Sequence, residues 1–327
     1  MPDLGRKGLR PLARTAAALA AAVVLSGAAG GGSPAGGPVF ADAFWKHWGD
    51  GRAELAGYDL TFPRYGSLRS GVAVTVFVTE TFSNALRVKS DPGQHPTSDE
   101  YPVMKLNLVR DFSTGIYDYN LMTSSFIALA AVNGRPAGSP TKVSFSSQEW
   151  CGNVFAQLLF DAGSARYTAH SYFDGEADQQ REVAVPLDAL DGDALLVWAR
   201  GFSPPLLARG ESRDVPLLGS LETSRLTHRP LALGRATLTR VNGVTSVVVP
   251  AGRFEVERRT VAIAGGPTVT IDVERDEPHR IVRWQSTTGE KAELLGSDRL
   301  KYWEMHDPGG EKALEKLGLT PRGRRMP

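Results

Sequence analysis

Residues 234–287 read GRATLTRVNGVTSVVVPAGRFEVERRTVAIAGGPTVTIDVERDEPHRIVRWQST. Apolar and polar residues alternate along this stretch between turn signals, which predicts at least four β-strands. The turn signals are Asn242-Gly243, Pro250-Ala251-Gly252, Gly265-Gly266-Pro267 and Glu277-Pro278. Asn-Gly and Gly-Gly suit tight hairpins because glycine accepts a positive φ. Strands spaced about ten residues apart indicate an antiparallel sheet, sandwich or barrel.

The same pattern of period two extends through the first half of the chain. In GVAVTVFVTETF (71–82) the valines alternate with a second, largely apolar face, so we expect a strand that is partly covered on both sides. MKLNLVRDF (104–112) and GIYDYNLMTSSF (115–126) are expected to pair as a hairpin. Helical patterns are few and lie at 188–202 and 310–319. The fold class predicted is therefore mainly β: an antiparallel curved sheet or half-barrel, or a β-sandwich, with a few short helices.

The first residues have the layout of a secretory signal peptide. Basic residues precede the apolar run TAAALAAAVVL (15–25), which is too short to span a bilayer as an ordinary transmembrane helix. Ser26 and Ala28 supply the small residues that signal peptidase needs, and Ala41 with Ala43 is a second choice. We expect cleavage after Ala28 or after Ala43, with an uncleaved anchor as the alternative. Because alanine cannot carry a lipid, no lipid anchor is expected.

The charge balance limits the partners of the chain. It has 37 basic and 36 acidic residues, and removal of residues 1–43 leaves 33 and 34. A nearly neutral chain has no strong field for nucleic acid or anionic lipid, so we expect no nucleic-acid partner. No other segment is apolar for about 18 residues, so no membrane span is expected after signal removal. We expect a periplasmic or secreted protein.

Two segments in the C-terminal half carry a resemblance. VVVPAGRFEVERRTV, followed by TVTIDVERDEPHRIVRW, resembles a domain of unknown function that is common in uncharacterised exported bacterial envelope proteins. The matching positions are Pro250, Ala251, Gly252, Phe254, Pro278, Ile281 and Arg283. The resemblance covers about residues 234–300, and the domain is similar in outline to the half-barrels of lipoprotein-carrier proteins. It implies an envelope protein whose concave face holds an apolar or lipid-like ligand.

The chain is predicted to have five parts. They are a signal peptide (1–28), a flexible linker (29–43), an N-terminal β-rich half (44–201), a loop or linker (202–220) and a C-terminal β-rich half (221–327). The loop is rich in proline, glycine and serine, which leaves two organisations open: two consecutive β domains or one continuous curved sheet. We favour the continuous sheet, because the resemblance covers too few residues to make a half-barrel alone.

Cys151 is the only cysteine, and it lies in the stretch SSQEWCGNVF (146–155). A nucleophilic thiol needs a base, and His170 in the next predicted strand is the candidate. No cysteine-hydrolase signature surrounds the thiol, so buried packing is the favoured interpretation, with a place in a ligand pocket as the alternative. Residues 151–163 fit a short helix or a strand equally well. No catalytic residue is assigned.

For the aromatic side chains on the predicted strands, ordinary core packing and cross-strand pairing is the favoured interpretation, with a ligand cavity as the alternative. A carboxylate beside apolar residues needs a partner in the interior or a place at a cavity mouth. The candidate ligand-binding residues are Glu149, Trp150, Cys151, Tyr117, Tyr119 and Tyr167. Trp45 and Trp48 are candidates to cover the end of a barrel as a plug or lid, with ordinary core packing again the favoured interpretation.

Signals for metals and cofactors are weak or absent. No two histidines lie within five residues of each other, and the mature sequence has no HExxH, CxxC, phosphate loop, nucleophile elbow or dinucleotide fingerprint. Asp272, Glu274 and Asp276 share one face at period two, which we interpret as the exposed charged face of an edge strand. We expect no metal and no cofactor.

Three functions are compatible with the sequence. The favoured one is a non-catalytic carrier that binds an apolar or lipid-like ligand in a concave β surface, which predicts an elongated aliphatic and aromatic cavity. The second is a structural or interaction protein of the cell envelope, which predicts a filled core and an envelope protein partner at exposed strand edges. The third and least favoured is a thiol enzyme, which predicts that the Cys151 thiol lies within hydrogen-bond reach of a histidine.

Overall fold

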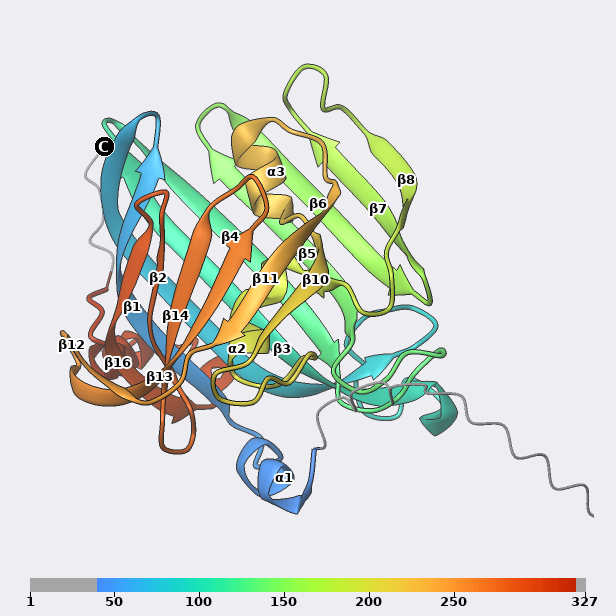
Figure 1. The fold of residues 1–327 in the computed structure, drawn as a ribbon, viewed down its shortest axis with the longest axis horizontal. Helices are drawn as coiled ribbons and strands as arrows, with labels where there is room; N and C mark the ends of the chain where they lie inside the picture. The colour runs from blue at the N-terminus through green and yellow to red at the C-terminus, as the bar shows by residue number, and fades with distance from the viewer. Residues whose placement is uncertain (1–39, 322–327) are drawn as a thin grey trace, which may run out of the picture. The chain divides into compact units, whose positions relative to one another are not determined.

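The computed structural model describes residues 40–321 (Figure 1). The signal peptide expected over 1–28 lies outside the described residues, as does most of the linker expected over 29–43. Helix α1 (Asp42–Trp48) begins inside that linker. The rings of Phe40 and Phe44 lie 4.7 Å apart and pack against the main core, so the end of the predicted flexible linker is folded.

Sixteen β-strands of the described residues form one sheet. The first eight are β1 (Ala53–Arg64), β2 (Ser67–Ser83), β3 (Glu100–Thr114), β4 (Tyr117–Ala128), β5 (Pro140–Glu149), β6 (Gly152–Asp161), β7 (Ser164–Ser171) and β8 (Gln179–Ala184). The other eight are β9 (Leu190–Asp191), β10 (Ser212–Leu218), β11 (Leu233–Arg240), β12 (Thr245–Val249), β13 (Gly252–Ile263), β14 (Thr268–Glu274), β15 (Ile281–Ser286) and β16 (Lys291–Leu300).

The strand order is β8-β7-β6-β5-β4-β3-β2-β1-β16-β15-β14-β13-β11-β10-β9, and β12 pairs with β13 beside this path. The sheet is curved and does not close, because β8 and β9 end the order without pairing to each other (Figure 1). The predicted mainly β fold with one curved sheet is thus confirmed. The strands lie in one compact unit of the chain, with no division into two β domains at 202–220.

The helices are short. Besides α1 they are α2 (Leu195–Ala199) and α3 (Leu221–Thr227), with 3-10 turns η1 (Thr97–Asp99), η2 (Gly192–Ala194), η3 (Tyr302–Glu304) and η4 (Gly310–Leu317). The helix expected over 188–202 is present only as η2 and α2, and the one expected over 310–319 is a 3-10 helix. None of the described helices has the length and apolar character needed to cross a membrane.

Strand β2 is covered on both faces, as its sequence predicts. Ala73 and Phe77 lie in the main core. Val76 and Val78 lie in a smaller core on the other face, where Leu317 of η4 covers them. The expected hairpin of residues 104–112 and 115–126 is also present, as the antiparallel pair β3 and β4.

The loop predicted over 202–220 is wrong in part, because it contains strand β10. Val215 and Leu217 alternate toward the main core, and β10 pairs with β11 along its length. Pro216 obscured this strand in the sequence. It is tolerated because β10 lies next to the end of the sheet, where β9 pairs with it over two residues only.

The interpretation of Asp272 and Glu274 as the exposed face of an edge strand is also wrong. Strand β14 lies between β13 and β15, and Asp272 is buried. Its carboxylate accepts hydrogen bonds from Arg258 and Arg283, and that of Glu274 accepts them from Arg280. These carboxylates therefore belong to ion pairs within the sheet.

The two ends of the sheet differ. Because successive strands are antiparallel, the β1–β2, β3–β4, β5–β6 and β7–β8 connections lie at one end, called here the hairpin end. The opposite end, called the loop end, carries α1 (Figure 1). There Trp48 packs against Phe77 and Phe202, with the guanidinium of Arg200 5.1 Å from its ring. Trp48 of α1 thus lies in the core at this end, in line with the favoured interpretation of ordinary core packing.

Candidate ligand-binding site

Helix α3 lies near the hairpin end, on the inner side of the sheet (Figure 1). Ser220 caps its N-terminus, since its hydroxyl accepts a hydrogen bond from the backbone N–H of Thr223 at 3.2 Å. His228, with a φ of 53°, ends it in the left-handed conformation. A helix of seven residues is not stable alone, so tertiary contacts must hold it.

Three strands supply those contacts through charged side chains. From β1, Arg64 donates to the carbonyl of Leu226 at 2.9 Å. From β3, Arg110 donates to Glu222 at 2.7 Å. From β5, Glu149 accepts a hydrogen bond from Arg225 at 2.5 Å. The helix is therefore fixed from three positions of the inner face.

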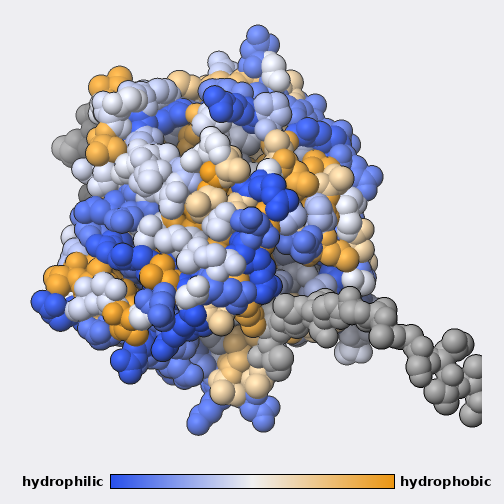
Figure 2. Space-filling model, viewed as in Figure 1, coloured by the Kyte–Doolittle hydropathy of each residue, from blue (hydrophilic) through white to orange (hydrophobic). Residues whose placement is uncertain are grey.

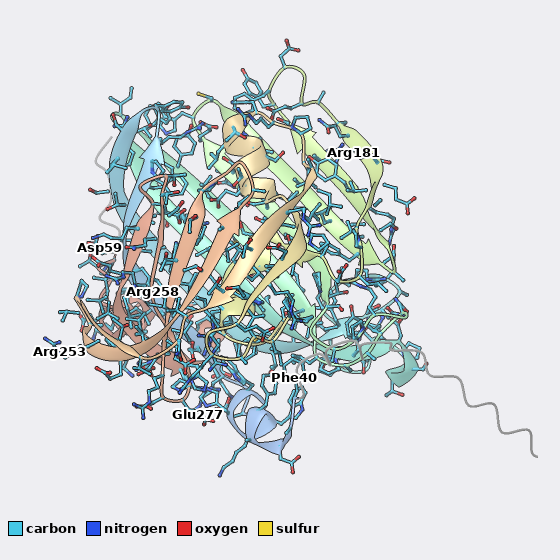
Figure 3. All side chains as sticks on the ribbon, viewed as in Figure 1. Phe40, Asp59, Arg181, Arg253, Arg258 and Glu277 are labelled. Atoms are coloured by element: carbon cyan, nitrogen blue, oxygen red, sulfur yellow. The ribbon has the colours of Figure 1, made fainter. Side chains whose placement is uncertain are left out.

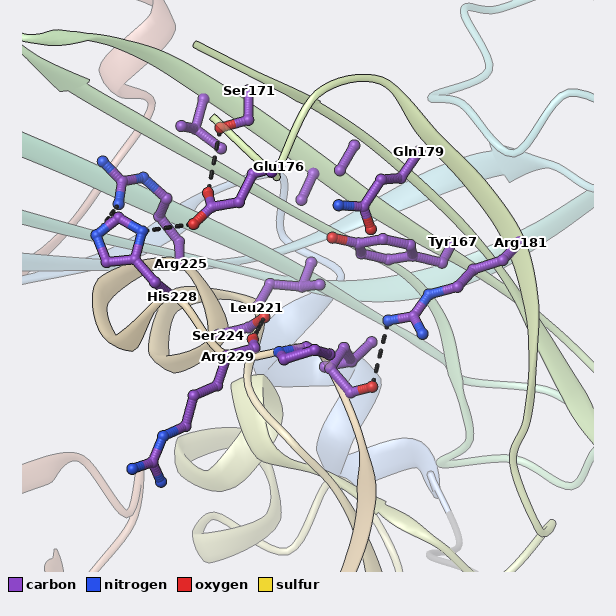
Figure 4. A pocket seen from close by; sticks show the side chains of 16 residues that line it. Tyr167, Ser171, Glu176, Gln179, Arg181, Leu221, Ser224, Arg225, His228 and Arg229 are labelled. Carbon is purple, nitrogen blue, oxygen red and sulfur yellow. Dashed lines mark hydrogen bonds and ion pairs between the residues drawn. The ribbon is translucent and has the colours of Figure 1, made fainter. Parts of the chain in front are cut away.

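A pocket of about 250 Å³, called the α3 pocket, lies between this helix and strands β6–β8 (Figure 4). Its floor is apolar and consists of Val154, Ala156 and Ala169 from the inner faces of β6 and β7. Leu221 and Leu231 line the opposite side. The pocket thus offers a small apolar surface on the concave side of the sheet.

Polar groups lie where β8 faces the chain segment that leads into β11. Arg181 of β8 donates to the carbonyl of Leu231 at 3.3 Å, across the place where the sheet does not close. Its guanidinium lies 5.0 Å from the ring of Tyr167, and Gln179 lies beside them (Figure 4). Arg181 is exposed and has no carboxylate partner among the described residues. The guanidinium of Arg229, which also belongs to a lining residue, points away from the pocket (Figure 4).

The β7–β8 loop is tied to α3 at the other side of the pocket. Glu176 in this loop pairs with His228 at 2.5 Å and accepts a hydrogen bond from Ser171 at 3.2 Å (Figure 4). Phe173 in the same loop covers the guanidinium of Arg225 at 3.7 Å. The loop therefore closes one side of the α3 pocket.

Glu149 has a partner in the interior, as its sequence position predicts. The side chains of Glu149 and Arg225 are only 1% and 3% exposed, so this is a buried ion pair. Sequence reasoning did not identify Arg225, because it stands in a short stretch with no helical repeat.

The tyrosines divide between two places. Tyr167 lines the α3 pocket. Tyr119 is buried, and its hydroxyl contacts that of Tyr65 at 2.6 Å and accepts a hydrogen bond from Arg64 at 3.1 Å. Burial is the main cause that raises the pKa of Tyr119 above its ordinary value. Tyr117 lies 5.8 Å from Tyr119 and is not among the residues that line the pocket.

Trp150 and Cys151 lie outside the pocket. Glu149 pairs with Gly152, so these two residues form the whole β5–β6 turn. Cys151 is exposed, so the favoured prediction of buried packing is wrong. The physical reason is that residues 151–163 continue directly into strand β6 and not into a helix that covers the thiol.

The surroundings of Cys151 differ from those that the thiol-enzyme hypothesis predicts. His170 pairs with Asp178 at 2.9 Å, and no hydrogen bond joins Cys151 to a histidine in the described part of the chain. Trp150 is 70% exposed and lies 6.3 Å from the ring of Tyr117. Within residues 40–321, no group of three histidine, cysteine or acidic side chains is placed to hold a metal ion.

Comparison with known proteins gives one structural likeness. No family model matches the chain, and no curated protein matches it significantly in sequence. A crystal structure of a β-barrel-like protein of a domain of unknown function (DUF1849) from Brucella abortus is similar, with a TM-score of 0.41 and 11% identity. The likeness covers 76% of this chain and 98% of that chain.

Proposed function

We propose that the protein is a non-catalytic, exported envelope protein that binds one end of a small lipid-like molecule in the α3 pocket. The observation that carries this proposal is the apolar floor of Val154, Ala156 and Ala169 on the concave side of the sheet. Arg181 and Gln179 lie at its edge and suit a polar or acidic head group, since a guanidinium binds carboxylate and phosphate oxygens well. Apolar surface with a few polar groups is the usual composition of a small-molecule site.

The size of the pocket limits the ligand. Inner side chains from both halves of the chain pack into one large core. A pocket of about 250 Å³ is slightly smaller than the usual small-molecule site of about 300–1,000 Å³. The proposal is therefore the end of an acyl chain with its head group, in place of the elongated cavity expected from the sequence.

Calorimetric titration of the mature protein with octanoate, octanol and acetate tests this function. We expect octanoate to bind most tightly, octanol more weakly and acetate not at all. The variant Ala169→Leu fills the floor and is expected to abolish octanoate binding. Thr168→Leu is the matched control, because Thr168 is the neighbouring residue on the other face of β7 and lies outside the pocket lining. Absence of octanoate binding, or equal loss in both variants, would contradict the proposal.

Exposed apolar residues favour a second candidate, an interaction protein of the cell envelope. Tyr65, Ile116, Trp150 and Tyr172 are each more than half exposed, and they lie in successive connections at the hairpin end. On the face seen in Figure 2, by contrast, apolar residues are scattered among polar ones. Aromatic residues are enriched where proteins contact each other. Loss of an envelope cross-link in an Ile116→Ser/Trp150→Ser variant would support this candidate, and unchanged cross-linking would exclude it.

A further inference from the structure

A second pocket, of about 440 Å³, lies at the loop end of the sheet. It is formed by α2 and the segment that follows it, together with β11, β13 and β14. Trp198, Leu207 and Val273 make an apolar wall. Five arginines also line it, so we call it the arginine pocket. Three of them, Arg209, Arg240 and Arg259, surround Glu257.

These three arginines share one carboxylate. Arg209 and Arg240 donate to Glu257 through their Nε atoms at 2.9 and 3.1 Å, and Arg259 donates to it through Nη2 at 3.0 Å. Burial opposes ionisation of Glu257, but hydrogen bonds from the three arginines outweigh it and lower the pKa of this carboxyl to about 2. Three guanidinium groups around one carboxylate leave an excess of two positive charges.

The other charged residues of the pocket have partners of their own. Arg200 pairs with Glu54 at 2.6 Å, and Glu274 pairs with Arg280 at 2.7 Å. Arg275 lies 3.7 Å from Asp276. The excess positive charge therefore comes from the three arginines around Glu257.

Of the three arginines around Glu257, Arg259 is the one with an unpaired buried hydrogen-bond donor. It stands directly opposite Arg240 in the pairing of β11 with β13, and like charges at such positions repel. Its Nη1 is buried and has no hydrogen-bond acceptor within the part of the chain that the structure describes. Burial and the neighbouring Arg240 lower the pKa of Arg259. An unpaired buried donor costs free energy, so this guanidinium is poorly satisfied in the ligand-free protein.

From this geometry we infer that the arginine pocket is a binding site for a small organic dianion, a phosphate monoester or a dicarboxylate. Its two negative charges balance the excess, and its oxygens are acceptors for the guanidinium groups that line the pocket. Guanidinium groups bind both kinds of oxyanion in a bidentate manner. The apolar wall of Trp198, Leu207 and Val273 contacts the organic part. The inference is independent of the ligand proposed for the α3 pocket.

Calorimetric titration at constant ionic strength tests the inference, with phenyl phosphate, glutarate and benzoate as probes. Binding of phenyl phosphate alone identifies a phosphate monoester site, binding of glutarate alone identifies a dicarboxylate site, and binding of both also supports the inference. Benzoate has the ring but one charge fewer, so we expect it to bind at least about tenfold more weakly. The inference is overturned if neither dianion binds, or if benzoate binds as tightly as the dianions.

Variants on one strand separate binding from a purely structural role. Arg259→Met is expected to weaken the dianion at least about tenfold. It should leave the melting temperature of the ligand-free protein unchanged or higher, because Glu257 keeps two arginines and an unpaired donor is removed. Arg253→Met is the matched control, since Arg253 is exposed at the edge of β13 (Figure 3) and, within residues 40–321, hydrogen-bonds only to Ser246. If Arg259→Met does not fold, Arg209→Met, at a half-exposed arginine, serves instead. Affinity equal to that of the wild type in the folded variant contradicts the assignment.

Discussion

Two ion-pair networks inside this sheet have opposite charge ratios. Near α3, one arginine, Arg110, is shared by Glu222 and Glu290. In the arginine pocket, one carboxylate, Glu257, is shared by three arginines. Burial and the nearby Glu290 and Asp193 raise the pKa of Glu222 to about 7, whereas three arginines lower that of Glu257 to about 2. The same type of side chain is thus shifted in opposite directions, upward mainly by burial at Glu222 and downward by three arginine partners at Glu257.

This difference shows where the protein has unsatisfied charge. Near α3, the buried ion pair of Glu149 and Arg225 is matched one to one. The arginine pocket keeps a surplus of positive charge that no described residue neutralises. A partly buried surplus costs free energy in the ligand-free protein and favours a ligand of opposite charge.

Replacing one arginine by methionine in each region should give the largest difference in the free energy of unfolding. Arg225→Met leaves the Glu149 carboxylate buried without its cation, and we expect a loss of about 3–5 kcal/mol in the free energy of unfolding. Arg259→Met in the arginine pocket should cause no loss. Urea denaturation of both variants measures the contrast. The double variant Glu149→Gln/Arg225→Met should recover part of the loss, and an equal loss in the two single variants would remove the distinction.

The pH dependence of stability should follow Glu222 near neutral pH. Its pKa in the folded protein, about 7, lies above the unfolded value of about 4.3, so the folded state holds the extra proton. Stability is therefore fully present below about pH 4.3 and falls as the pH rises to about 7, by at most about 3–4 kcal/mol. In Glu222→Gln, denaturation across pH 4.5–7.5 should show a flatter profile, and an unchanged slope would assign the effect to another group.

Glu257 should make stability depend on pH in the opposite direction, and at lower pH. Its pKa is lowered, so its contribution is present above the unfolded value of about 4.3 and is lost as the pH falls toward about 2. Because Arg209 is half exposed, we expect the contribution to be only about 1–2 kcal/mol. Thermal melts between pH 2 and 5 should be steeper in the wild type than in Glu257→Gln. Parallel profiles would show that the arginines do not depend on this carboxylate.

Substitutions in the β5–β6 turn should change the free energy of unfolding least. Trp150→Ala and Cys151→Ser remove exposed side chains, so we expect changes within about 0.5 kcal/mol. Iodoacetamide should label Cys151 in the native protein without denaturant. Labelling only after unfolding would contradict the exposed position of this thiol.

The fold followed from the sequence because strand periodicity is a local signal. Residues 71–82 and 234–287 alternate clearly, and their turns carry glycine or proline, so strands and hairpins were predictable. Strand β10 was missed because Pro216 and the flanking glycines and serines have the composition of a loop. Only its pairing with β11 and the burial of Val215 and Leu217 overcome that composition.

The sites were less predictable, because they depend on residues far apart in the chain. An interior partner was one of the two places expected for Glu149, but that partner, Arg225, is 76 residues away. Arg209, Arg240 and Arg259 share no motif, and they converge on Glu257 only after β11 pairs with β13. Trp150 and Cys151 are rare residue types, which made them candidates for a site. They form a two-residue turn, however, and such a turn exposes their side chains.

The pairing of β1 with β16 has a consequence for the order of assembly. Strands β1 to β8 pair with their neighbours in sequence, so each hairpin has its partner as soon as it is synthesised. The other edge of β1, by contrast, pairs with β16, so that Ala53 lies opposite Leu300. Contacts over such separations form slowly because a long loop must close first. One edge of β1 therefore stays unpaired, and able to pair with other strands, until β16 has been made.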